Sequence, residues 1–271
     1  MNGTLGNFDW DDHRLKNNTK DLDTLPKKVN WGNPFFFGIK NPRGQTLSWF
    51  STDNEDQYSN NMMNKKNRQL LQKNNWIDAQ ISYTFNSHGF RSEEFETGID
   101  VLFNGDSNTV GVGLPLDLTW SKIVADHFNI PHNNLAVSGT DNTFIAQRSV
   151  YWLPIIKPKV YVIKATTVQR YNWWGFDKAV KTTAGENLKE NRSAIETATI
   201  KNNYEWSYYV FRAVIERLCK NLDIKLIIVP PGKEKTGKDP SQDLARDLMH
   251  YGIKENRTMG KLIIDKIKKI T

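Results

Sequence analysis

Short apolar runs rich in β-branched residues, each closed by a turn signal, recur along the chain at 99–105, 133–139, 159–165 and 225–231. Between and after them, apolar residues recur at three- and four-residue spacing over 118–128, 142–153, 204–222 and 255–269. Continuous apolar runs of this length are typical of buried parallel strands, and the spacing of the other stretches predicts helices. The alternation therefore predicts an α/β fold, a doubly wound three-layer sandwich with a mostly parallel central sheet.

The first 80 residues follow a different pattern. They show no sustained helical or strand period, and glycine, proline and asparagine interrupt them. Aromatic residues are nevertheless frequent there: Trp31, Phe35, Phe36, Phe37, Trp49, Phe50 and Trp76. Because disordered segments are poor in aromatic residues, we expect an irregular but ordered extension over 1–80. We expect it to pack against the main domain, 81–271, or against a partner, and to contain one helix over 61–73.

Composition and charge narrow the class of protein. The chain has 271 residues, of which 38% are hydrophobic, which suits one large domain with a buried core. Lys and Arg number 37 against 30 Asp and Glu, a net charge of +7. The basic residues near the C-terminus alternate with apolar ones, as on the solvated face of a helix, and no nucleic-acid-binding motif accompanies them. We therefore expect no nucleic-acid partner.

Membrane insertion and disulfide bonding are not expected either. The chain has no run of about 18 apolar residues, and its start lacks the basic and apolar regions of a secretory signal. We expect no membrane span and no Sec signal, and the compartment stays open. The single cysteine, Cys219, cannot form an intramolecular disulfide, and it lies in a stretch with helical apolar spacing. Core packing is the favoured interpretation of this thiol over a nucleophilic role.

Residues able to carry chemistry follow the predicted strands, where ligands bind in such sheets. The first strand leads into Gly105-Asp106-Ser107, and a serine in a tight strand-to-helix turn exposes its hydroxyl at the edge of the sheet. Gly105 is expected to allow the sharp turn. Such a turn alone also occurs without a catalytic role. Support comes from Asp247 and His250, three residues apart, because this carboxylate can reach the imidazole Nδ1 and leave Nε2 free as a base.

In the order and spacing of these blocks the sequence resembles the SGNH (GDSL-like) hydrolases, over about residues 83–270. The nucleophile block is Asn-Gly-Asp-Ser-Asn at 104–108, a second block ends at Gly139, and the last is the Asp-x-x-His that ends at His250. Residues 86–92 match the Asn-x-x-Gly-Phe-Arg segment found ahead of the nucleophile in a subset of these proteins. The resemblance implies the flavodoxin-like fold of that family.

The resemblance also implies roles for individual residues. Ser107 would attack an ester carbonyl, His250 would take its proton, and Asp247 would orient His250. The backbone N–H groups of Ser107 and Gly139 would bind the oxyanion. This mechanism requires no metal and no organic cofactor, and we expect none.

One block departs from the family pattern. SGNH hydrolases carry Gly-x-Asn-Asp at the third strand end, where the asparagine donates to the oxyanion, whereas the matching segment 164–170 has no Asn-Asp pair. Thr167 is the candidate substitute, Gln169 and Asn172 are alternatives, and a hole of two backbone groups is another. Loss of one oxyanion donor costs about 10²–10³ in turnover, so the departure bears on rate more than on reaction class.

Arg170 and Trp173 follow this segment directly and are candidate substrate-binding residues. With Trp174 they place a cation and two indoles near the predicted cleft. Aromatic platforms suit sugar rings, although packing of buried tryptophan is an equally good interpretation.

Three functional hypotheses follow. The leading one is a serine esterase that removes small acyl groups, acetyl above all, from a carbohydrate or another small ester. The second uses the same triad for acyl transfer to a sugar hydroxyl. The third is a structural or binding protein, for example of a viral particle, that docks into an assembly through residues 1–80. The missing Gly-x-Asn-Asp favours the third hypothesis, and the presence of all three triad residues speaks against it.

Overall fold

The computed structural model describes residues 42–167, 170–174, 179–183, 201–231 and 243–271. These residues belong to one compact unit, which spans Asn41–Thr271. The expected boundary at residue 80 thus lies inside this unit, and residues 42–80 fold together with the sheet domain.

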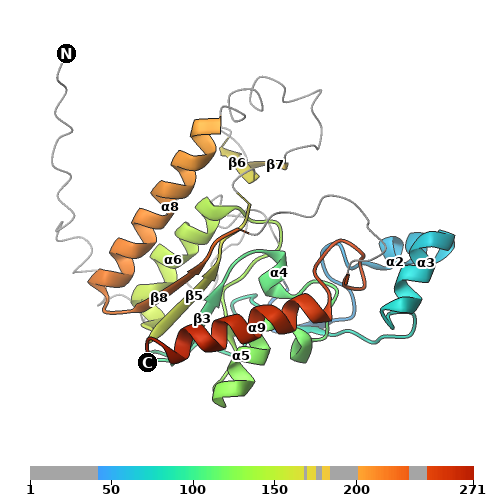
Figure 1. Ribbon diagram of the computed structural model, residues 1–271, viewed down its shortest axis with the longest axis horizontal. Helices are drawn as coiled ribbons and strands as arrows, with labels where there is room; N and C mark the ends of the chain where they lie inside the picture. The colour runs from blue at the N-terminus through green and yellow to red at the C-terminus, as the bar shows by residue number, and fades with distance from the viewer. Residues whose placement is uncertain (1–41, 168–169, 175–178, 184–200, 232–242) are drawn as a thin grey trace. The chain divides into compact units, whose positions relative to one another are not determined.

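A four-stranded parallel sheet forms the centre of the fold (Figure 1). Its order is β4-β3-β5-β8, the strands being Asn133–Asn134, Val101–Asn104, Val160–Lys164 and Lys225–Val229. Each strand comes from one of the four apolar runs in the sequence. Numbered along the chain, the sheet strands lie in the order 2-1-3-4, as in flavodoxin-like folds. The predicted α/β class with a parallel sheet is confirmed.

Helices cover both faces of the sheet (Figure 1). On one face, α5 (Trp120–Phe128) contacts α9 (Ile253–Lys268), and on the other α6 (Asn142–Ile156) contacts α8 (Lys201–Asn221). Alternate strand residues point to opposite faces. Val101 and Phe103 of β3 therefore pack into the α5–α9 layer, whereas Asn104 reaches the Ile145 carbonyl of α6. The burial of both faces explains why the strands read as continuous apolar runs.

Residues 42–80 are more regular than their sequence pattern predicts. Two helices, α2 (Glu55–Met63) and α3 (Lys65–Lys73), follow β1 (Thr46–Leu47), which pairs antiparallel with β2 (Tyr83–Thr84). The single helix predicted over 61–73 is wrong. Asn64 ends α2 and caps α3, because its side chain accepts the N–H of Asn67. An asparagine side chain that bonds to the local backbone in this way competes with helix continuation.

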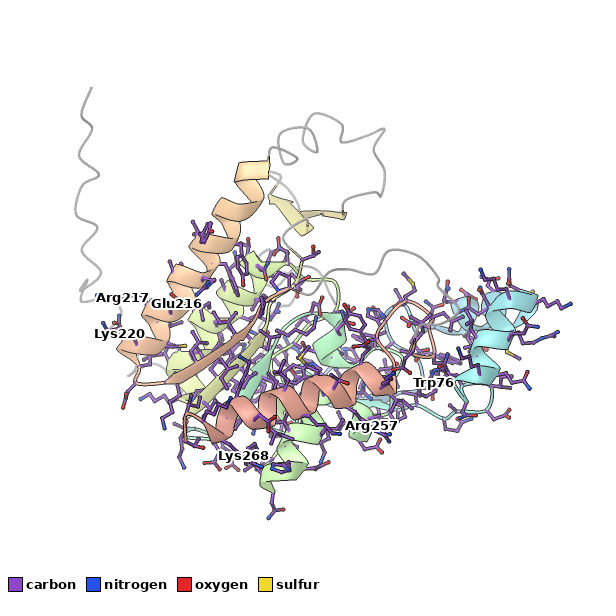
Figure 2. The ribbon with its side chains drawn as sticks, viewed as in Figure 1. Trp76, Glu216, Arg217, Lys220, Arg257 and Lys268 are labelled. Atoms are coloured by element: carbon purple, nitrogen blue, oxygen red, sulfur yellow. The ribbon has the colours of Figure 1, made fainter. Side chains whose placement is uncertain are left out.

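These N-terminal helices pack against the loop that carries Asp247 and His250. Leu70 and Leu71 of α3 share a buried cluster with Leu244 and Leu248. Trp76, labelled in Figure 2, is buried there and donates its Nε1–H to the Leu244 carbonyl at 2.7 Å. Residues 42–80 therefore form part of the support of the C-terminal loop.

The remaining described elements add little to the core. A short helix, α4 (Ser107–Val110), and the 3-10 turn η3 (Leu116–Leu118) lie between β3 and α5. After β5, the antiparallel pair β6 (Arg170–Trp174) and β7 (Ala179–Thr183) was not predicted. Charged residues of α8 and α9, including Arg217 and Lys268, are exposed (Figure 2). Among the helices that the structure describes, none is long and apolar enough to span a membrane.

Candidate active site

Ser107 begins α4, three residues after the end of β3. Asp106 caps this helix by accepting the N–H of Asn108 at 3.0 Å. A Cβ on Gly105 would lie 2.2 Å from Thr109 Oγ1 and 3.0 Å from the Lys164 carbonyl oxygen. Gly105 does not have a positive φ. The site therefore requires glycine for close packing, and not for the turn conformation expected from the sequence.

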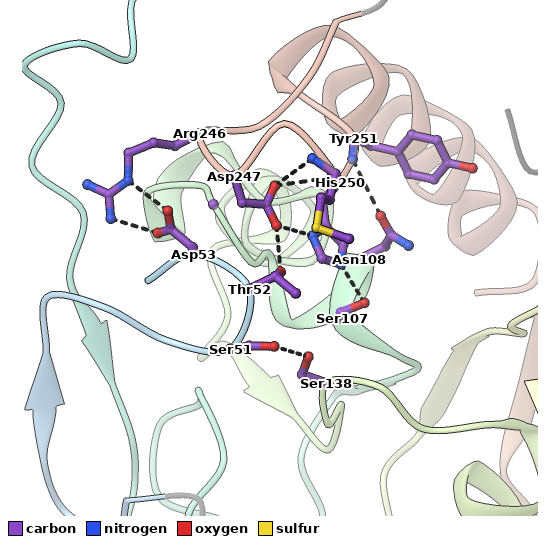
Figure 3. Close-up of polar contacts among 12 residues, drawn as sticks. Ser51, Thr52, Asp53, Ser107, Asn108, Ser138, Arg246, Asp247, His250 and Tyr251 are labelled. Atoms are coloured by element: carbon purple, nitrogen blue, oxygen red, sulfur yellow. Dashed lines mark hydrogen bonds and ion pairs between the residues drawn. The ribbon is translucent and has the colours of Figure 1, made fainter. Parts of the chain in front are cut away.

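The structure brings Ser107, His250 and Asp247 together (Figure 3). His250 Nε2 lies 2.7 Å from Ser107 Oγ, and His250 Nδ1 lies 2.5 Å from Asp247 Oδ2. Ser107 and His250 are 143 residues apart in the chain. The side chain of Asp247 is fully buried, whereas that of His250 is 12% exposed. The carboxylate and the serine are thus buried, and the imidazole between them is the most exposed of the three residues.

The loop between Asp243 and Tyr251 fixes the carboxylate and the imidazole. The N–H of Ala245 donates to the His250 carbonyl at 3.0 Å and closes the loop. Asp247 Oδ1 accepts the N–H groups of Met249 and His250, at 3.0 and 3.1 Å. These two hydrogen bonds fix Oδ1, and the other oxygen, Oδ2, faces the imidazole.

The surroundings of Asp247 keep it ionised. Burial alone raises the pKa of this carboxyl, but the charge and hydrogen bond of His250, the Thr52 hydroxyl and the Met249 N–H outweigh it, and the net pKa lies below its ordinary value. An ionised carboxylate can only accept hydrogen bonds, so the proton between the two groups belongs to His250 Nδ1. In neutral His250, Nε2 then carries the lone pair and accepts the Ser107 hydroxyl proton.

The sequence resemblance assigns the oxyanion hole to two backbone N–H groups, those of Ser107 and Gly139. The N–H of Ser107 is at the first position of α4, and Gly139 is in the left-handed region with φ 70°. Within the described part of the chain, neither N–H makes a hydrogen bond to the protein. Both are thus available as donors, and their catalytic role stays a prediction.

Arg148 of α6 joins the nucleophile block to the Gly139 block. Its Nη2 donates to the Gly105 carbonyl at 3.1 Å and to Thr140 Oγ1 at 3.2 Å. Burial lowers the pKa of Arg148 to about 10, which leaves the guanidinium charged at neutral pH. Sequence reasoning did not assign Arg148 a role. The signal present was an arginine inside a predicted helix with a largely apolar pattern.

The segment 86–92 has a structural role beside the site. Asn86 Oδ1 accepts the N–H of Phe90 at 3.0 Å. Arg91 is 1% exposed, and its guanidinium donates to the carbonyls of Val110 and Gly111 at 3.1 and 2.8 Å. The Asn-x-x-Gly-Phe-Arg residues thereby support the chain that leaves α4.

The N-terminal region supplies two contacts that sequence reasoning missed. Thr52 Oγ1 donates to Asp247 Oδ2 at 2.6 Å, and Ser51 Oγ lies 2.7 Å from Ser138 Oγ, next to Gly139 (Figure 3). Thr52 and Asp247 are 195 residues apart. Because residues 42–54 show no periodicity and no motif, the sequence carries no signal for either contact.

The other predicted site residues are less defined. Thr167 lies just beyond the end of β5, beside Thr166, whose N–H and carbonyl bond to the Asn142 side chain at 3.0 and 2.9 Å. Arg170 and Trp173 are in β6, but their side chains lie outside what the structure describes. Their predicted contact with substrate, and the donor role of Thr167, stay predictions.

Other reactive groups do not gather into a second centre in the described ranges. Cys219 is buried in α8, and burial raises the pKa of its thiol to about 12. This agrees with core packing, since a thiolate is the nucleophilic form. In the residues that the structure describes, no three His, Cys, Asp or Glu side chains are placed to hold a metal ion.

Neither a family model nor a curated protein matches the sequence. Solved structures are similar to it, among them a carbohydrate esterase with divergent catalytic and non-catalytic binding functions (15% identity, 64% of this chain and 66% of that one, TM-score 0.35). Another is esterase EstA of Pseudoalteromonas sp., with 16% identity over 63% of this chain and 97% of that one and a TM-score of 0.35. A third is a GDSL-like lipase of Bacteroides thetaiotaomicron, with 15% identity over 64% of this chain and 89% of that one and a TM-score of 0.31. The chain thus spans just under two thirds of the first protein and most of the other two.

Proposed function

We propose that this protein is a serine esterase of SGNH type, which hydrolyses small acyl esters through an acyl-Ser107 intermediate. The observation that carries the proposal is the unbroken series of contacts from Ser107 Oγ through His250 to Asp247, at 2.7 and 2.5 Å. A hydroxyl is a weak nucleophile until a base takes its proton, and a base works best when a third group fixes its tautomer and orientation. All three parts are in hydrogen-bond contact here.

The reaction proceeds in two halves. Ser107 Oγ attacks the ester carbonyl carbon as its proton passes to His250 Nε2, and the negative oxygen that forms is stabilised by the N–H groups of Ser107 and Gly139. His250 then gives the proton to the leaving alkoxide, and the acyl group stays on Ser107. Water attacks this acyl-enzyme, His250 takes its proton and returns one to Ser107, and the carboxylic acid leaves. Asp247 stays ionised throughout and stabilises the imidazolium.

For the substrate, we propose an acetyl or similarly small acyl ester of a carbohydrate. Trp173 and Trp174 support this class, because they lie in β6, the strand that follows β5 and its C-terminal end. Indole rings pack well against sugar rings. The net charge of +7 would also suit an anionic glycan.

A fluorophosphonate tests the reaction without a choice of substrate, because it forms a bond between an activated serine Oγ and phosphorus with loss of fluoride. Intact-mass measurement should show one adduct on the wild-type protein and none on Ser107→Ala. His250→Ala should react at least about 100-fold more slowly, since general-base catalysis contributes about 10²–10⁴. Ser59→Ala, on α2, is the matched control and should react as the wild type does. A folded wild-type protein that forms no adduct, or one whose adduct survives in Ser107→Ala, contradicts the proposal. Product analysis with acetylated oligosaccharides then tests the substrate class.

A further inference from the structure

A tight turn from the N-terminal region reaches the active site. The N–H of Phe50 donates to the Asp53 carbonyl at 2.8 Å, and the N–H of Asp53 donates to the Phe50 carbonyl at 3.1 Å. Ser51 and Thr52 are therefore the two central residues, and Ser51 has a φ of 59°. A non-glycine residue in this left-handed conformation is uncommon and needs support from its surroundings. That support comes from the side-chain contacts of three consecutive residues, Ser51, Thr52 and Asp53.

Three consecutive side chains of this turn bind three parts of the site (Figure 3). Ser51 contacts Ser138 beside Gly139, Thr52 donates to Asp247, and Asp53 binds Arg246, the residue before Asp247. One turn of the chain thus spans the distance between the expected oxyanion hole and the triad carboxylate.

The Thr52 hydroxyl completes the hydrogen bonding of Asp247. A carboxylate offers about four lone-pair positions. On Oδ1 the N–H groups of Met249 and His250 occupy two of them, and on Oδ2 the His250 Nδ1–H occupies a third. Thr52 Oγ1, at 2.6 Å, occupies the fourth. It bonds to the same oxygen as the imidazole, so it determines where that oxygen lies relative to Nδ1.

The neighbouring residue anchors Thr52. The Asp53 carboxylate is 1% exposed and accepts from Arg246 Nε at 2.9 Å and from Arg246 Nη2 at 2.6 Å. The Tyr83 hydroxyl adds a third bond at 2.5 Å. A bidentate, buried ion pair of this kind fixes geometry as well as charge. Because Asp53 follows Thr52 and Arg246 precedes Asp247, this pair holds the two partners of the Thr52–Asp247 bond in register.

We propose that Thr52 is a positioning residue of the active site, which holds the Asp247 carboxylate against His250 and so supports general-base catalysis by the imidazole. The inference rests on the proposed serine esterase function. It assigns the N-terminal turn to the catalytic apparatus, so that residues 50–53 belong to the site and not to an appended docking segment.

The test compares Thr52→Val, which keeps the shape and removes the hydroxyl, with Thr52→Ser, which keeps the hydroxyl. Fluorophosphonate labelling at several probe concentrations gives a limiting rate constant and a half-saturating concentration for each variant. We expect the limiting rate constant of Thr52→Val to fall on the order of tenfold, as for loss of one hydrogen bond to a charged group, with the half-saturating concentration unchanged. Thr52→Ser should restore the rate to within about twofold of the wild type. Thr52→Ala is the second hydroxyl-free variant and should match Thr52→Val.

Thr46→Val is the matched control, because it removes an exposed Thr46–Thr84 hydrogen bond of 3.0 Å on the same N-terminal segment. It should label at the wild-type rate. Far-ultraviolet circular dichroism and urea midpoints establish that each variant is folded. If folded Thr52→Val labels at the same limiting rate as the wild type, the positioning role is overturned but the proposed function is not. The same holds if Thr52→Ser loses as much labelling rate as Thr52→Val. A wild-type protein that does not label overturns the proposed function and this inference together.

Discussion

The buried ion pair between Asp53 and Arg246 gives the sharpest prediction about stability. The side chains are 1% and 4% exposed, and the closest oxygen and nitrogen are 2.6 Å apart. Replacing Arg246 by methionine removes two of the three side-chain hydrogen bonds of Asp53 and leaves its negative charge buried with only the Tyr83 hydroxyl. Loss of one partner of a buried pair costs about 3–5 kcal/mol, because the other charge is left uncompensated.

Asp53→Asn should cost a similar amount, since it removes the negative charge beside the buried Arg246 guanidinium, whose other contacts are two carbonyls, those of Ala79 and Ser48, and the rings of Trp49 and Tyr58. The double variant removes both charges. The loss of unfolding free energy in the double variant should therefore be smaller than the sum of the losses in the two single variants, by about 2–3 kcal/mol, as expected for groups in direct contact. Urea unfolding followed by circular dichroism measures all four free energies.

The surface pair of Asp100 and Lys159 is the matched control. Its N–O distance of 2.7 Å is nearly the same, but its side chains are 51% and 72% exposed. Asp100→Asn should change the free energy of unfolding by less than about 1 kcal/mol. The reasoning would be refuted if each single variant at Asp53 or Arg246 lost less than about 1 kcal/mol of unfolding free energy. It would also be refuted if the loss in the double variant equalled the sum of the single losses, because burial would then not control the strength of this pair.

Two further predictions concern the site itself. Gly105→Ala places a Cβ 2.2 Å from Thr109 Oγ1 and 3.0 Å from the Lys164 carbonyl oxygen. We therefore expect the free energy of unfolding to fall by about 1–3 kcal/mol in urea unfolding, and Ser107 to label more slowly by intact mass. Wild-type values in both measurements would contradict this prediction. Because the folded-state pKa of Asp247 is depressed, the unfolded chain binds a proton first as the pH falls. The stabilisation by Asp247 is thus present above about pH 4 and lost below it, and Asp247→Asn should flatten the fall of the thermal midpoint in that range; an equally steep fall in the variant would refute the assignment.

The sheet and its main helices could be predicted because their signals are local. The apolar runs that became β3 and β5 are buried on both faces, so they read as continuous hydrophobic segments. Asp247 and His250 could be paired because three residues on one turn set their distance. The meeting of Ser107 with His250 depends on the fold, and the sequence indicated it only through the order of the blocks.

The contacts of the N-terminal region could not be predicted, for physical reasons. The Thr52–Asp247 bond joins segments 195 residues apart, and neither segment carries a periodic pattern that indicates its partner. The break at Asn64 was missed because a polar residue within a short amphipathic stretch is compatible with one helix or two. The spacing of apolar residues gives no information where side-chain hydrogen bonds determine the geometry.

The separation of these contacts along the chain has a consequence for biosynthesis. Residues 50–53 emerge from the ribosome before their partners Arg246 and Asp247, which lie 193 and 195 residues further along the chain than Asp53 and Thr52. Closing so long a loop is entropically costly, so we expect contacts of this separation to form after the local helices and the sheet. An activated serine would then arise only after these long-range contacts have formed, and labelling of Ser107 would report that stage in the folding of the nascent protein.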